Sequence, residues 1–347
     1  MRPLLAGVAA SAHRLPRVAP SAVRRASIGS LVCVAAIVLT GAAVRLTGSG
    51  LGCSDWPNCT TGHLTPPLQY HSLIEFGNRM VTIVLVVVIG ATFLAILLRR
   101  PYRRDLAWLA GGLVVGVLAE AVLGGIVVYS KLNPYLVMVH FLATMVLLVL
   151  GVVLVHRTAR DYSAPGRLLV PRPALLLSRG LLVLLAIVFA AGAATTGAAP
   201  DGGSAQGQII KRIPVSLRDL AELHSTLALL VVGVVLSLAV LLHALDVPER
   251  VRRAARMLVV VLVLQAVVGY TQYFTHLPAA LVEVHELGAT ALCIGAVQYF
   301  LSLTHHAAEE VAVRLRAVPD LAGDGARAAA ELGPAPDAAE GTTAVRS

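Results

Sequence analysis

Glu120-Ala-Val-Leu-Gly124 and Leu136-Val-Met-Val-His140 reappear in this sequence as Gln265-Ala-Val-Val-Gly269 and Leu281-Val-Glu-Val-His285. The offset is 145 residues in both places, and the match needs no gap. Internal repetition at a fixed offset indicates a fold built from copies of one unit. The sequence therefore predicts two related halves.

The segments around the repeat are long and apolar. Hydrophobic residues make up 57% of the 347 residues and charged residues only 14%, whereas a soluble domain carries about 25% charged residues. A helix that crosses a bilayer needs roughly 20 apolar residues. Runs of this kind predict eight membrane helices at 29–47, 73–98, 106–129, 136–156, 177–198, 219–243, 254–275 and 280–303. With the repeat, they predict an all-α integral membrane protein of two pseudo-symmetric four-helix bundles.

The flanking segments complete the predicted organisation. The last forty or so residues are rich in Ala, Gly, Pro and Glu, a composition typical of disorder. The first segment has arginines but no separate apolar core with a cleavage site, so we interpret it as a tail rather than a signal peptide. The predicted parts are an N-terminal tail (1–28), an N-terminal bundle (29–157), a linker (158–176), a C-terminal bundle (177–304) and a disordered tail (305–347).

Basic residues predict the orientation. Lys and Arg favour the cytoplasmic side of membrane proteins, and most of the 28 lie in the tails and in the loops that share their side. The predicted outer segments hold only Arg45, Lys131, Lys211, Arg212 and Arg218. We therefore expect both termini in the cytoplasm and a multi-pass protein of the cell membrane. The net charge of +9 then reflects membrane topology, and nucleic-acid binding is not expected.

Three histidines lie near the outer ends of predicted helices: His140, His224 and His285. A histidine in an apolar helix is costly and usually faces the bundle interior with a partner. Two imidazoles from facing helices of a four-helix bundle can ligate a haem iron from both sides. The alternative is a hydrogen bond to a backbone carbonyl and no further role. Because His140 and His285 occupy equivalent positions in the repeat and His224 adds a third histidine, we favour a haem site between His224 and His285.

The N-terminal bundle offers a less regular ligand set. His140 is present, but Asn78 stands where His224 would predict a histidine. His71, Glu75 and Asn78 share one face of a helix. His71 is either a displaced ligand or an interfacial residue at the helix start. Because Asn is a poor iron ligand, we expect the haem iron in this bundle to be held by protein from one side only. Catalytic metal sites likewise keep one coordination position open, so this arrangement suits a substrate better than a fixed cofactor.

Glu75 is a carboxylate near the mouth of a predicted membrane helix. Ionisable residues in membranes are functional candidates, and a carboxyl group can transfer protons in catalysis. The alternative role is a salt bridge to Arg79, four residues further along the same helix face. Arg79 and Arg45 are themselves candidates for binding haem propionates or for anchoring the membrane interface.

A glycine-rich segment, Gly48-Ser-Gly-Leu-Gly-Cys53-Ser-Asp-Trp-Pro-Asn-Cys59, precedes that helix. Its two cysteines are close enough in sequence to pair, and the predicted outer location is oxidising, so a disulfide is feasible. The pair is then either a structural clamp or a redox-active couple.

These residues resemble a known family. Arg45-Leu-Thr-Gly-Ser-Gly-Leu-Gly-Cys53-Ser-Asp-Trp-Pro-Asn-Cys59, the segment Glu75 to Arg79, and the spaced His140, His224 and His285 are similar to those of haem A synthases. The resemblance covers residues from about 30 to 305. It implies oxidation of the C8 methyl group of haem O to a formyl group, which gives haem A for cytochrome oxidase assembly. Many members carry His where this chain has Asn78.

The resemblance also implies a division of labour. The C-terminal bundle would hold haem b between His224 and His285. The N-terminal bundle, with His140 and Glu75, would bind haem O as substrate below the cysteine loop. Lys211 and Arg212 would contact haem propionates or a partner, such as haem O synthase or an oxidase assembly factor, or would be solvated. The alternative function, which uses the same histidines, is a di-haem b-type membrane electron-transfer protein.

Overall fold

The computed structural model describes residues 17–160, 166–199, 203 and 210–305. Eight helices in these segments are long and apolar enough to cross a membrane. They are α2 (Pro20–Leu46), α3 (Tyr70–Leu97), α4 (Arg104–Tyr129), α5 (Pro134–Thr158), α6 (Arg172–Ala198), α7 (Leu217–Ala244), α8 (Glu249–Phe274) and α9 (Ala279–Ser302). The short strands β1 (Arg167–Leu168) and β2 (Thr304–His305) pair antiparallel.

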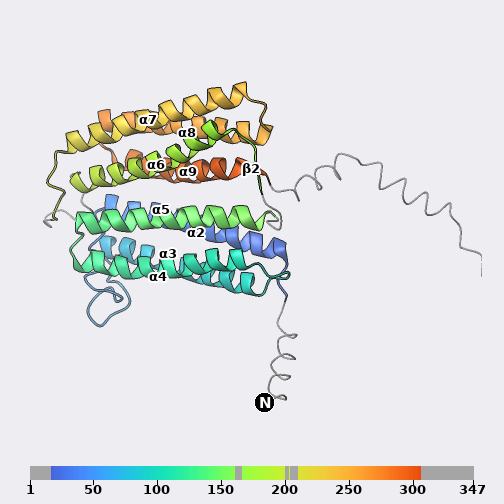
Figure 1. Ribbon diagram of the computed structural model, residues 1–347. Coiled ribbons are helices and arrows are strands. Elements are labelled where there is room, and N and C mark those ends of the chain that lie inside the picture. The colour runs from blue at the N-terminus through green and yellow to red at the C-terminus, as the bar shows by residue number, and fades with distance from the viewer. Residues whose placement is uncertain (1–16, 161–165, 200–202, 204–209, 306–347) are drawn as a thin grey trace, which may run out of the picture.

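The helices form two groups of four, α2–α5 and α6–α9 (Figure 1). Each group has its own hydrophobic core. Leu181, Leu238 and Leu258 belong to the core of α6–α9, whereas Ile89 and Leu148 belong to the core of α2–α5. The prediction of an all-α membrane protein with two four-helix groups is confirmed.

The two groups meet along α2, α5, α6 and α9. Cys293 of α9 is buried in the core of α2–α5, so the interface is apolar at that depth. At one end of the molecule, the Gly50 N–H donates to the Gly203 carbonyl at 2.7 Å. At the opposite end, β1 precedes α6 and pairs with β2, which follows α9. The groups are therefore joined at both ends and through the middle.

Several helices begin earlier than their apolar runs predict. α2 begins at Pro20 rather than near residue 29, α6 at Arg172 rather than 177, and α8 at Glu249 rather than 254. Proline suits the first turn of a helix, where its missing N–H costs no hydrogen bond, and α2 and α6 both have one there. Each added turn contains arginine, so a criterion based on uninterrupted apolar length excludes it. Of the predicted tails, 1–28 and 305–347, residues 1–16 and 306–347 lie outside the described residues, and residues 20–28 belong to α2.

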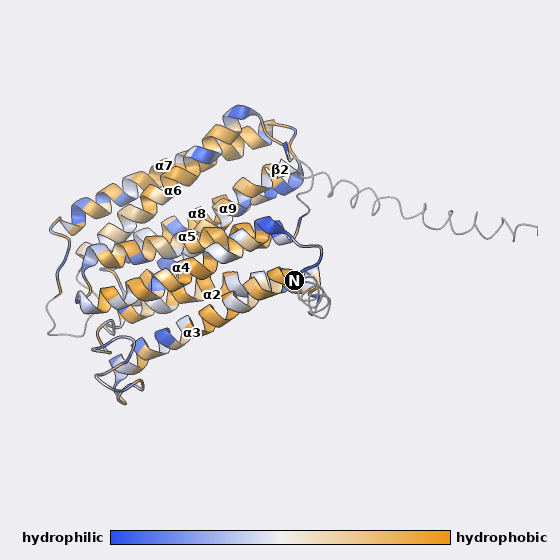
Figure 2. Cartoon of the chain, turned by 60° about the horizontal axis from the view of Figure 1, so that its bottom comes forward, coloured by the Kyte–Doolittle hydropathy of each residue, from blue (hydrophilic) through white to orange (hydrophobic). Residues whose placement is uncertain are grey.

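The helix surfaces suit a lipid environment. Hydrophobic residues cover most of the length of each helix, and hydrophilic ones gather toward helix ends and connections (Figure 2). Large apolar side chains are exposed in the middle of helices, including Val115 at 68% and Val183 at 62%. Lipid tails solvate such side chains as well as a protein core does. The predicted orientation of the two ends across the membrane stays a prediction.

Candidate functional site

Two histidine rings face each other inside the α6–α9 group. His224 lies in the second turn of α7, and His285 lies in the second turn of α9. Their ring centroids are 6.3 Å apart and the rings are inclined at 78°. The repeat thus predicted two positions that the fold brings together.

The second bundle holds these rings in place. Nδ1 of His224 is 3.1 Å from the Val188 carbonyl oxygen of α6. A donor bond from Nδ1 leaves Nε2 as the free ligand atom. Glycines border both rings: a Cβ at Gly192 would lie 3.0 Å from Cε1 of His224, and one at Gly269 would lie 3.2 Å from Cε1 of His285. Because glycine has no Cβ, each imidazole can lie against the helix backbone at these positions. Any larger residue at Gly192 or Gly269 would push the ring away.

The distance between the rings fits a shared metal ion. Metal–imidazole bonds are roughly 2 Å long, as known for zinc, so two imidazoles on opposite sides of one ion have ring centres about 6 Å apart. The observed 6.3 Å agrees with that spacing. Bis-histidine ligation is one of the ways in which helix bundles hold a haem iron.

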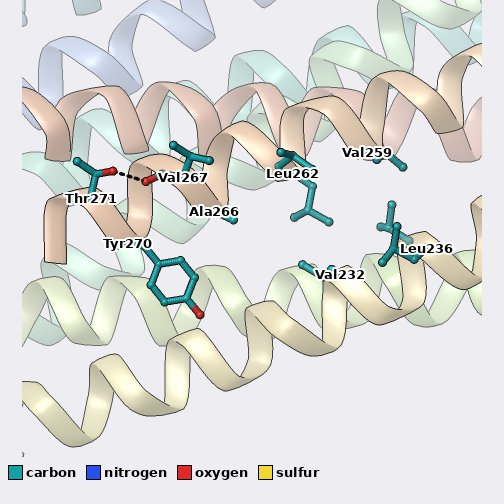
Figure 3. Close-up of a pocket in the computed structure, with 10 residues that line it drawn as sticks. Val232, Leu236, Val259, Leu262, Ala266, Val267, Tyr270 and Thr271 are labelled. Atoms are coloured by element: carbon teal, nitrogen blue, oxygen red, sulfur yellow. Dashed lines mark hydrogen bonds between the residues drawn. The ribbon is translucent and has the colours of Figure 1, made fainter. Parts of the chain in front are cut away.

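An apolar cavity of about 450 Å³ lies between α7 and α8 (Figure 3), and neither His224 nor His285 is among its lining residues. Tyr270 lines its outer part and directly follows Gly269, which contacts the His285 ring. The rest of the lining is apolar apart from Thr271, whose hydroxyl donates to the Val267 carbonyl at 2.7 Å. An apolar space of this kind suits a flat hydrophobic group.

The α2–α5 group has a single histidine at the equivalent place. Nδ1 of His140 on α5 is 2.6 Å from Oε2 of Glu120 on α4. The Thr144 hydroxyl donates to the same oxygen at 3.0 Å. Sequence reasoning quoted Glu120 as part of the repeat and gave it no role. A carboxylate within an apolar helix is by itself a signal of function and would have identified it.

Asn78 occupies the position that corresponds to His224. Its Oδ1 accepts a 2.7 Å hydrogen bond from Thr40 of α2, much as His224 contacts α6. His71 lies about two turns before Asn78, at the start of α3, and its Nδ1 is 3.1 Å from the Ser49 hydroxyl. Within the described residues, no hydrogen bond or ring contact joins His140 to either side chain. The site therefore presents one imidazole and one amide.

Glu75 is buried between α3 and the cysteine loop. Its Oε2 accepts a 2.7 Å hydrogen bond from the Cys53 N–H, and its Oε1 is 2.6 Å from Nη2 of Arg79. The salt bridge that the i, i+4 spacing predicted is therefore present. Nη1 of Arg79 donates to the carbonyls of Asp55 at 3.0 Å and Asn58 at 2.7 Å. The Glu75–Arg79 pair thus fastens the loop to α3.

The same loop is fastened to α4. Cys53 and Cys59 form a disulfide, and both are fully buried. The Tyr129 hydroxyl at the end of α4 donates to the Trp56 carbonyl at 2.6 Å. The indole of Trp56 lies against Gly125, where a Cβ would be 2.8 Å from the ring. The loop therefore bridges α3 and α4 as a clamp.

The other basic residues predicted to contact haem propionates lie at the end of the molecule that carries the cysteine loop. Arg45, at the end of α2, is 4.0 Å from Glu286 of α9 and so links the two groups. Lys211 and Arg212 are exposed in the segment that leads to α7. Their predicted contacts with propionates stay predictions.

Comparison with protein families identifies the family to which this chain belongs. The model of the COX15-CtaA family, described as cytochrome oxidase assembly protein, matches residues 24–73 and 68–297. The chain belongs to the COX15-CtaA family. The matched residues include the histidine positions, Glu75 and the cysteine loop.

Individual relatives of this COX15-CtaA protein are named Heme A synthase. The one from Geobacillus kaustophilus is 37% identical over 108 residues, which are 30% of this chain and 32% of the relative. The one from Geobacillus thermodenitrificans is 33% identical over the same length, again 32% of the relative. The chain thus spans about a third of the length of these two relatives. The one from Shewanella oneidensis is 25% identical over 314 residues, 78% of this chain and 94% of the relative.

Proposed function

We propose that this COX15-CtaA protein oxidises the C8 methyl group of haem O to a formyl group and so produces haem A for cytochrome oxidase. One observation carries the proposal: the two bundles share a design but differ in their ligands. The α6–α9 group has two facing imidazoles, whereas the α2–α5 group has one imidazole, an amide and a clamped carboxylate. A closed ligand pair suits a retained cofactor, and an open position suits a reacting substrate. The names of the relatives support the same reaction.

The C-terminal bundle, 177–304, would hold haem b. His224 and His285 would ligate the iron. Haem b would supply one-electron chemistry there. The protein's contribution is to fix the two imidazoles and to exclude water with an apolar lining.

The N-terminal bundle, 29–157, would bind haem O. His140 would hold its iron from one side; its side chain is 38% exposed, so a ligand can reach it. Asn78 would face the other side, held by Thr40. His71, held by Ser49, remains a further candidate ligand.

Glu75 would transfer protons at the outer mouth of this site. It is buried, and Arg79 and the Cys53 N–H hold its carboxylate in one position, as a general acid or base requires. Arg45, Lys211 and Arg212 would bind propionates at the outer face. Arg79 would join them only by releasing the loop carbonyls of Asp55 and Asn58.

The surroundings follow from the same proposal. The protein would span the cell membrane with both tails, 1–28 and 305–347, and the linker 158–176 in the cytoplasm. The cysteine loop would lie outside, where an oxidising compartment maintains its disulfide. Haem O synthase or oxidase assembly factors would deliver the substrate or accept the product.

Extraction of bound pigments tests the function. Protein purified from cells that make haem O should carry haem b and yield haem A. His140→Ala should abolish haem A and retain haem b, whereas His285→Ala should lose haem b. Recovery of haem b alone, with haem O available, would overturn the proposal and favour a di-haem b-type electron carrier.

A further inference from the structure

Three positions around the repeat histidines differ between the two halves in a concerted way. Glu120 corresponds to Gln265, Ala143 to Gly288, and Thr144 to Ala289 at the constant offset of 145 residues. The histidine and the glycine that borders its ring are shared, whereas Met138 corresponds to Glu283 and Phe141 to Glu286. The two histidines therefore have the same place but different neighbours.

In the first bundle, the carboxylate lies against the ring. Oε2 of Glu120 is 2.6 Å from Nδ1 of His140. The Thr144 hydroxyl lies 3.0 Å from that oxygen and 3.0 Å from the His140 carbonyl oxygen, so its one proton serves either acceptor and the hydroxyl adjoins the carboxylate on the ring side. The Glu120 side chain is 12% exposed, which limits competition from water.

In the second bundle, the amide turns away from the ring. Nε2 of Gln265 donates to the backbone carbonyl of His285 at 2.8 Å. Its Oε1 fills the space beside Gly288, where a Cβ would lie 1.9 Å away. Within the described residues, neither Nδ1 makes a hydrogen bond of good geometry, but Nδ1 of His140 has a carboxylate oxygen at 2.6 Å and Nδ1 of His285 has none so close. Gly288 thus permits an orientation of Gln265 that leaves the imidazole without a close acceptor at Nδ1.

We propose that Glu120 is a positioning residue that orients His140 through Nδ1 and thereby strengthens its bond from Nε2 to the iron of haem O. This inference rests on the proposed function, in which His140 ligates the substrate haem. A carboxylate that accepts from Nδ1–H fixes the tautomer of a metal-bound histidine and raises its basicity. With one protein imidazole available, the strength of that single bond determines how firmly the substrate is held.

The alternative is that Glu120 only fills space between α4 and α5. Against it stands Gln265, a neutral residue of nearly the same shape that bridges α8 and α9 at the equivalent position. A carboxylate in a membrane helix costs more than an amide. The charge is therefore retained for what it does to His140 rather than for packing.

The test compares Glu120→Gln with the natural protein in detergent. Haem O is titrated into protein that retains haem b, and the absorption and electron paramagnetic resonance spectra are recorded. We expect a roughly 10–100-fold loss of haem O affinity, the usual effect of removing such a partner. The spectrum of bound haem O should shift, while that of haem b at His224 and His285 should not.

Thr144→Ala is the second variant, because it releases the carboxylate without removing it. It should shift the spectrum in the same direction by a smaller amount. If Glu120→Gln loses haem b through misfolding, Thr144→Ala decides alone by the same criterion. Unchanged affinity and spectrum, in protein where His140→Ala abolishes haem O binding, would overturn the role of Glu120 alone. Undiminished haem O binding in His140→Ala would instead refute the proposed substrate site.

Discussion

At the scale of single residues, Glu75 links the loop to the proposed chemistry. One of its oxygens accepts from the Cys53 N–H and the other pairs with Arg79. The carboxylate is therefore held in a fixed place and its charge is balanced. A proton-transfer group needs such positioning, but a structural clamp needs it as well, so a substitution has to separate the two roles.

Glu75→Gln makes that separation. Glutamine can still accept from the Cys53 N–H, whereas it cannot carry a proton between substrate and surroundings. We expect haem b content and the disulfide to be retained and haem A formation to fall by about 10²–10⁴-fold, the usual contribution of a general acid or base. Product formation is measured by extracting and separating the haems. Turnover equal to that of the natural protein would refute a catalytic role.

At the scale of elements, the cysteine loop joins the outer ends of α3 and α4. Glu75 and Arg79 attach it to α3, and Tyr129 and Trp56 attach it to α4. The two cysteines are fully buried. Reagents therefore reach the disulfide only when the loop opens, and the packing of Trp56 controls that opening.

Gly125→Ala should loosen this clamp. The new Cβ would lie 2.8 Å from the Trp56 ring, and overpacking of this kind costs about 1–3 kcal/mol. We expect faster reduction of the Cys53–Cys59 disulfide by a soluble thiol, measured by alkylation and mass spectrometry. Gly111→Ala on the same helix is the control, because its nearest neighbour would be 3.7 Å away. Equal reduction rates in the two variants would contradict the clamp.

The helices themselves could be predicted from sequence, but their contacts could not. Apolar length identified all eight because a bilayer sets the length of a crossing helix. The starts of α2 and α8 were placed late because arginines lie in their first turns. The attachment of the loop to α4 depends on Trp56 reaching Gly125, a contact between distant segments that no local pattern encodes.

The candidate site was predictable where the repeat fixed it. His285 is the repeat equivalent of His140, and His224 comes from the second helix of the same bundle, so the predicted bundle brought the two rings together. Glu120 was identifiable as a carboxylate in an apolar helix, but its partner His140 is identified only by a distance across two helices. His71 and Asn78 shared a helix face as predicted, yet each is engaged by a different residue of α2 or of the segment after it.

At the scale of the whole molecule, two copies of one bundle have to stay in register. Their outer ends meet where Arg45 of α2 lies 4.0 Å from Glu286 of α9, and both side chains are less than one-fifth exposed. Glu286 directly follows His285. This pair therefore connects the α2–α5 group to the helix turn that carries a proposed haem ligand.

Removing either partner of the Arg45–Glu286 pair should lower stability. Removing both should cost less than the sum of the two single losses. Glu286→Gln leaves Arg45 short of one counter-charge in a largely buried place, which costs about 1–3 kcal/mol. We expect a lower midpoint of haem b loss on heating for Glu286→Gln and for Arg45→Met, with a coupling of at least about 0.5 kcal/mol in the double variant. Arg218→Met is the control, because the Arg218–Glu222 pair is 78% and 62% exposed and such pairs contribute about 0–1 kcal/mol. Strictly additive effects would mean that the two groups are held together by their apolar interface and not by this ion pair.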